Sequence, residues 1–132
     1  MSINERFNKK TGESVAADVA RYPNELDRDA VGLFQIVPQG RVNFGLSGTD
    51  LDDYVRLAVH ALLNAGAVPV RGERGSGYQW IAQKQYGNIQ DQIVEGIISE
   101  WRAMPDDPVI LCTEGIWFAR PRTESPHYVK MN

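Results

Sequence analysis

The sequence has a single cysteine, Cys112, among its 132 residues. One cysteine cannot form a disulfide within the chain, which is typical of proteins from a reducing compartment, so we expect a cytoplasmic location. The chain also lacks any apolar run near the roughly 20 residues that a membrane-spanning helix needs. Its polar start, MSINERFNKK, lacks the apolar segment of a secretory signal. We therefore expect no membrane partner.

Neither sign of charge dominates, since 14 Lys and Arg stand against 17 Asp and Glu, for a net charge of −3. A nucleic-acid binder needs a basic excess or a basic stripe, so no nucleic-acid partner is expected. Histidine is scarce as well, with only 2 in the chain. The carboxylates at 50–53 and 106–107 therefore lack the His or Cys neighbours of a transition-metal site, and they do not match a calcium loop. We expect no metal and no cofactor.

No nucleophile and base stand in a recognisable arrangement. His60 falls on the polar stripe of an expected helix, which we interpret as a solvent-facing stripe with an Asp52–Arg56 ion pair. Cys112 ends an apolar run and is interpreted as a buried, inert thiol. Ser76 lies between glycines but does not match the G-x-S-x-G pattern of serine hydrolases. A non-enzymatic protein is therefore the favoured expectation over an enzyme.

The composition that is present, 42% hydrophobic and 23% charged, is that of an ordinary globular domain. Residues 1–13 are polar and aperiodic, and we interpret them as a flexible N-terminal arm. Residues 14–132 are expected to form a single α+β domain. It begins with a short helix, for which Ser14 is the expected N-cap and Pro23 the stop.

Apolar periodicity predicts two long helices, over 49–64 and over 88–104. Gly66 follows the first as a C-cap, and Pro105 ends the second. Runs rich in β-branched and aromatic residues predict three pairs of strands. These pairs are 30–37 with 41–46, 67–70 with 78–83, and 109–112 with 116–120.

The expected order is thus a short helix followed by ββα-ββα-ββ. This order predicts a mostly antiparallel sheet of about six strands with both long helices on one face. It contains the βαββαβ succession of ferredoxin-like folds. The two ββα units agree in pattern with almost no identity, so duplication and chance both stay open.

The most distinctive segment is a glycine-rich loop with two arginines. Its backbone amides and guanidiniums are suited to a phosphate or carboxylate. A solvated hairpin tip, which uses glycine for positive φ and charge for solubility, explains the same residues and is favoured. The candidate ligand-binding residues are Arg71, Arg74, Gly75, Ser76, Gly77 and Tyr78.

The first and last expected strands are apolar on both faces, whereas a strand covered on one side should alternate. Part of the sheet's second face must therefore be covered by the N-terminal segment, by the tail or by another protein. The candidate interface residues are Phe34, Ile36, Ile116, Trp117 and Phe118. We expect a bacterial-type, non-enzymatic protein-interaction module that binds a protein partner or itself as a homodimer, through the sheet face or edge. The alternative is a small-molecule or anion-binding domain, with or without enzymatic activity, that uses the loop from Arg71 to Gly77.

Overall fold

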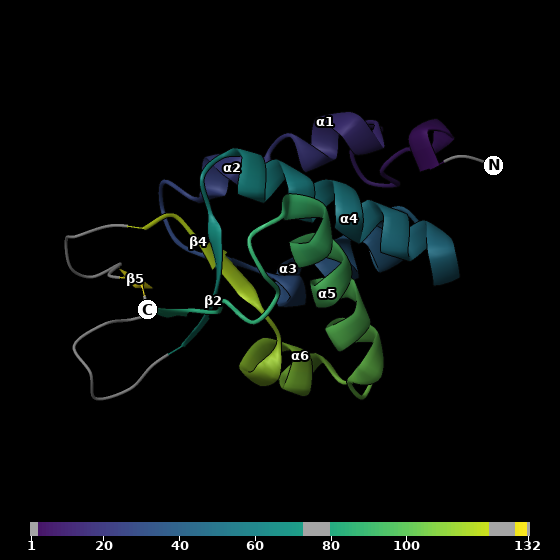
Figure 1. Ribbon diagram of the computed structural model, residues 1–132. Helices are drawn as coiled ribbons and strands as arrows, with labels where there is room; N and C mark the ends of the chain where they lie inside the picture. The colour runs from purple at the N-terminus through teal and green to yellow at the C-terminus, as the bar shows by residue number, and fades with distance from the viewer. Residues whose placement is uncertain (1–2, 73–79, 122–128, 132) are drawn as a thin grey trace.

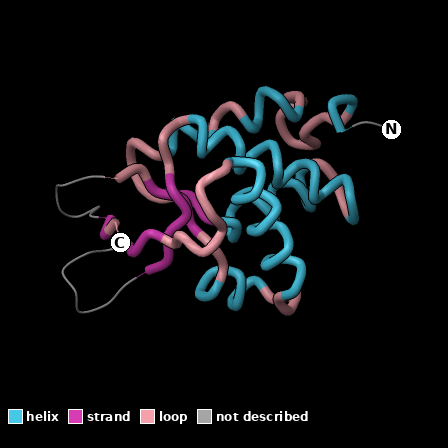
Figure 2. Tube along the Cα trace, in the orientation of Figure 1, coloured by secondary structure: helices cyan, strands magenta, loops and turns pink. Residues whose placement is uncertain are grey.

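The computed structural model describes residues 3–72, 80–121 and 129–131 of the chain (Figure 1). They form an α+β fold, in which the strands gather at one end of the molecule and the helices at the other (Figure 2). Within these ranges, no helix combines the length and the apolar character that crossing a membrane requires.

Both long helices are confirmed, as α4 (Gly48–Asn64) and α5 (Gln90–Ala103). The buried residues of α4 recur at helical spacing, and they include Tyr54, whose place between Leu51 and Ala58 puts it on the same stripe. On α5 the buried residues are Val94, Ile97, Ile98 and Trp101. The two helices pack against each other. The chain leaves α5 at Met104, directly before Pro105.

The N-terminal part is helical and lies along α4 (Figure 1). The expected short helix is α1 (Val15–Val19), whose N-cap Ser14 accepts a hydrogen bond from the backbone N–H of Ala17 at 3.1 Å. A 3-10 turn, η1 (Ile3–Glu5), precedes it, and α2 (Tyr22–Glu25) follows. Ile3 is buried. The division into a flexible arm and a domain stays a prediction.

The hairpin expected over 30–46 is wrong. Only β1 (Val31–Gly32) is a strand, and it leads into α3 (Leu33–Pro38) and the π-helix η2 (Gln39–Asn43). A short apolar run is compatible with a buried strand or a buried helix, and here Leu33, Ile36 and Val37 are buried at helical spacing. The side chain of Gln35 also accepts from the Gly32 N–H at 2.9 Å, which satisfies a donor at the helix start.

The strand expected over 109–112 is also wrong, because α6 (Pro108–Glu114) covers it. Asp107 is the N-cap, with its carboxylate accepting from the backbone N–H of Val109 at 2.8 Å, and Pro108 occupies the first turn. This local signal for a helix start outweighs the β-branched residues that follow. The chain then turns at Gly115 into β4 (Trp117–Ala119), where a strand was expected.

The sheet has five strands in the described ranges and is mixed, which corrects the expectation of about six mostly antiparallel strands. The remaining strands are β2 (Val68–Gly72), β3 (Trp80–Ala82) and β5 (Val129–Lys130). The order across the sheet is β1-β4-β2-β3-β5. The pairs β1–β4, β4–β2 and β2–β3 are antiparallel, and β3–β5 is parallel. The β2–β3 pairing matches the expected second hairpin.

Apolar side chains lie on both faces of this sheet, because neighbouring residues of a strand point to opposite sides. On β4, Phe118 joins the main core, which also contains Val31 and the buried residues of α4 and α5. Both long helices therefore lie on that side of the sheet. Trp117 and Ala119 instead join a second cluster that includes Val70, Ala82, Val129 and Trp80. The second face is thus apolar too. The apolar character expected on both faces of the last strand holds at β4, whereas residues 33–38 of the first expected strand form a helix.

Candidate interaction surface

Three aromatic rings form a continuous row at the second face of the sheet; we call Phe34, Trp117 and Trp80 the aromatic row. Phe34 stacks on Trp117 with ring centroids 6.4 Å apart. The ring centroids of Trp117 and Trp80 are 5.6 Å apart, across β2. The three rings come from α3, β4 and β3, so the row depends on strand pairing and not on nearness in sequence. Such rings supply a large apolar contact area with few rotatable bonds.

Trp117 is held in place from two sides. Its ring lies against the backbone of β1, where a Cβ on Gly32 would come within 2.6 Å of Trp117 Cδ2. Its indole Nε1–H donates to the carbonyl of Cys112 at 3.1 Å. The absence of a side chain at Gly32 and this hydrogen bond together fix the orientation of the central ring.

The row is partly open to solvent. Phe34 is 37% exposed, and Trp117 and Trp80 are half-buried. The indole N–H of Trp80 is buried and has no acceptor among the residues that the structure describes. Aromatic residues are enriched in the buried centre of protein–protein interfaces, so a partly exposed aromatic surface suits such a contact.

The structure brings together two of the five candidate interface residues. Phe34 and Trp117 stack at the surface, whereas Ile36, Ile116 and Phe118 are at most 1% exposed and belong to the main core. Their apolar character is accounted for within the chain, because the segment around Ile36 is a helix packed on α4 and not a two-sided strand. Sequence reasoning missed Trp80 as a member of the row, although its place on an expected strand was recognised.

Arg71 is engaged inside the chain. Its Nε–H donates to the carbonyl of Glu114 at 3.3 Å, its Nη1 donates to Gln83 Oε1 at 3.2 Å, and its Nη2 bonds the carboxylate of Glu100. These contacts tie β2 to α5 and to the end of α6. The other candidate ligand-binding residues, Arg74, Gly75, Ser76, Gly77 and Tyr78, lie outside the described residues, so the anion-site alternative stays a prediction.

Tyr86 shares the carboxylate of Glu100 with Arg71. Its hydroxyl donates to both oxygens of Glu100, each at 3.0 Å. Burial, reinforced by the negative charge of Glu100, raises the pKa of Tyr86 to about 12. The phenol therefore stays protonated at neutral pH and acts as a hydrogen-bond donor.

The polar stripe of α4 borders α5 and stays partly exposed to solvent. Arg56 donates to both carboxylate oxygens of Glu95, at 2.7 and 3.0 Å, and also to Asp53 at 2.8 Å. Asp52 instead accepts from Arg102 at 2.6 Å, so the expected Asp52–Arg56 pair is wrong. The hydrogen bond from Arg56 lowers the pKa of Glu95. His60 lies in the same row, where Nδ1 is 2.9 Å from Gln90 Nε2.

A buried polar network, which the sequence did not indicate, joins α1, α2, η2 and α4. Tyr54 donates to Asp18 Oδ2 at 2.6 Å, and Gln39 Nε2 donates to Asp18 Oδ1 at 3.0 Å. The hydroxyls of Tyr22 and Tyr54 are 2.7 Å apart. Burial raises the pKa of both tyrosines. Because the polar atoms satisfy one another, the network is an internal connection between helices rather than an open site.

The described residues contain no group of three or more His, Cys, Asp or Glu side chains placed to hold a metal ion. Comparison of the chain with protein-family models, curated proteins and solved structures finds no match.

Proposed function

We propose that this protein is a non-enzymatic interaction module that binds a protein through the aromatic row. The partner that we propose is a second copy of the chain. The observation that carries the proposal is the packing of Phe34, Trp117 and Trp80 into one partly exposed surface. Aromatic residues are enriched among the few interface residues that supply most of the binding free energy.

Rigidity supports the same proposal. Trp117 is fixed by the backbone of β1 and by the Cys112 carbonyl before any partner arrives. A surface that is already ordered loses little conformational entropy on binding. Phe34, at the exposed end of the row, is the residue whose truncation should weaken the contact most.

A matched pair of variants tests the proposal, because Phe34 and Leu57 have nearly equal exposure, at 37% and 40%. Light scattering of the wild type should give a mass that rises with concentration above 14.8 kDa toward twice that value. Phe34→Glu should restore the monomer, and Leu57→Glu should leave the association unchanged. Equal effects of the two variants would contradict the proposal for self-association.

A wild type that stays monomeric at every concentration moves the test to other partners. Quantitative capture from an extract of the source cells, with wild type, Phe34→Glu and Leu57→Glu as baits, should then find a protein that only Phe34→Glu loses. If no protein shows that difference, the aromatic row is not a binding surface.

A further inference from the structure

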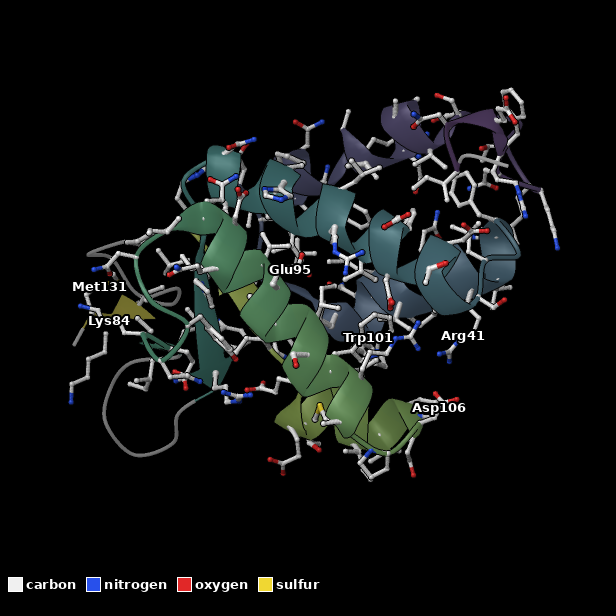
Figure 3. The ribbon with its side chains drawn as sticks, turned by 45° about the vertical axis from the view of Figure 1, so that its right-hand side comes forward. Arg41, Lys84, Glu95, Trp101, Asp106 and Met131 are labelled. Atoms are coloured by element: carbon white, nitrogen blue, oxygen red, sulfur yellow. The ribbon has the colours of Figure 1, made fainter. Side chains whose placement is uncertain are left out.

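A hollow of about 150 Å³ opens between α3, the end of α5 and the start of α6. Its floor is apolar and comes from the main core, since Val37, Trp101 and Leu111 line it and each is at most 9% exposed. Its rim carries Arg41 and Asp106, which Figure 3 shows near Trp101. A hollow that combines an apolar floor with polar groups at its mouth is a common form of small-molecule site.

The guanidinium of Arg41 is the rim group most available to a ligand. Its Nη1 is 3.0 Å from Asp106 Oδ1, and the two side chains are 42% and 82% exposed. Such an exposed pair contributes little to stability, so a competing anion can replace Asp106. The other acid, Asp107, is occupied as the N-cap of α6.

Arg102 is engaged elsewhere but adds positive charge to the same rim. It bonds Asp52 and the carbonyl of Gly48, and its guanidinium lies 4.2 Å from the centroid of the Trp101 ring. The rim thus carries two guanidinium groups above an apolar floor. Arg102 is held by Asp52 and Gly48, whereas Arg41 can exchange Asp106 for another anion.

We propose that this hollow binds a small carboxylate whose apolar body is about the size of a phenyl ring. The hollow is open to solvent, but its volume of about 150 Å³ equals that of cavities that bind benzene, which sets the size of the body. The body contacts Trp101 and Leu111, and the carboxylate replaces Asp106 on Arg41 through charge-assisted hydrogen bonds. The hollow adjoins the aromatic row, because Phe34 also lines it. The proposal rests on Arg41, Trp101 and Leu111, so it does not depend on protein binding.

The test is an NMR titration of the folded protein with phenylacetate and with its neutral counterpart phenylacetamide. The indole resonance of Trp101 and the methyl resonances of Leu111 should shift, while the methyl resonances of Leu57 serve as the remote control. A titration with N-acetylglycyl-phenylalanine distinguishes a free acid from the carboxyl end of a peptide, according to which ligand binds more tightly.

Two exposed substitutions should change the affinity in opposite directions. Arg41→Gln should weaken phenylacetate binding about tenfold, because it removes the charge-assisted contact, and should leave phenylacetamide binding unchanged. Asp106→Asn should strengthen phenylacetate binding by about two- to fivefold, because it removes the competing anion. No shift at Trp101 with either acid, or equal responses of the acid and the amide to Arg41→Gln, would overturn the proposal.

Discussion

At the residue scale, Asp18 is the buried carboxyl group that joins the N-terminal helices to α4. Its side chain is 4% exposed, and its carboxylate accepts from both Tyr54 and Gln39. A buried polar group that loses its partner costs much more than the bond itself contributes when made. Removing the hydroxyl of Tyr54 should therefore lower the stability by more than the hydrogen bond itself contributes.

We expect Tyr54→Phe to lower the free energy of unfolding by about 1–3 kcal/mol, because Asp18 Oδ2 loses its closest donor while the ring stays packed. Urea denaturation at neutral pH measures the change. Tyr22→Phe is the control, since it removes only the hydroxyl–hydroxyl bond to Tyr54 and should cost about 0.5–1.5 kcal/mol. A Tyr54→Phe protein as stable as the wild type would show that Asp18 does not need this donor.

Tyr86 gives the protein a dependence on alkaline pH. Its pKa rises from 10.0 to about 12 on folding, so the folded state favours the protonated phenol. That contribution to stability is complete below about pH 10 and is lost as the pH rises through about 12. We expect Tyr86→Phe to lose less stability than the wild type over this range, as measured by urea denaturation at a series of pH values. Parallel losses in the two proteins would contradict the assignment.

At the element scale, the packing of β1 against β4 requires a glycine. A Cβ on Gly32 would meet three ring atoms of Trp117 at 2.6 to 2.8 Å, and the ring is also held by its bond to Cys112. The indole must therefore move before any larger residue can fit. The same contact sets the position of the central ring of the aromatic row.

We expect Gly32→Ala to cost about 1–3 kcal/mol through overpacking and to change the near-ultraviolet circular dichroism of the tryptophans. Gly72→Ala is the matched control on β2, because nothing lies within 4 Å of the added Cβ. Denaturation of the two variants side by side separates the clash from the general effect of adding a methyl group. Equal stability of both variants would show that Trp117 is free to shift.

At the scale of the whole molecule, Trp101 connects α5 to the main core. It is 6% exposed and belongs to the cluster that also contains residues of α3, α4 and β4. Removing its ring leaves a cavity that the surrounding helices can fill only in part. We expect Trp101→Ala to cost about 3–5 kcal/mol in chemical denaturation. Ile89→Ala, at a residue 60% exposed, should change stability by less than about 0.5 kcal/mol.

The sequence by itself determined the long helices and the second hairpin. The stripe from Leu51 to Leu62 and the buried residues of α5 follow the helical period, which depends only on local spacing. Ser14 as a cap and the stop before Pro105 are local as well. The apolar character of both faces of β4 was also readable, because it needed only composition along that strand.

Tertiary structure alone decided the state of residues 33–43, whereas residues 109–114 carried a local helix signal. Short apolar runs bury themselves equally well as helix or strand, and the choice depends on what packs against them. In α3, Ile36 and Val37 pack in the main core, so residues 33–38 form a helix. Ile36 is therefore buried and is not available at the expected interface. In α6 the cap at Asp107 was a local signal, and it was underestimated beside the β-branched residues.

Tertiary structure alone also decided which side chains meet. The row of Phe34, Trp117 and Trp80 joins segments far apart in the chain, and it exists because β4 lies between β1 and β2. Arg71 bonds Glu100 for the same kind of reason, since α5 crosses the face on which Arg71 lies. Spacing along the chain specifies a face of an element, but it cannot specify which other element covers that face.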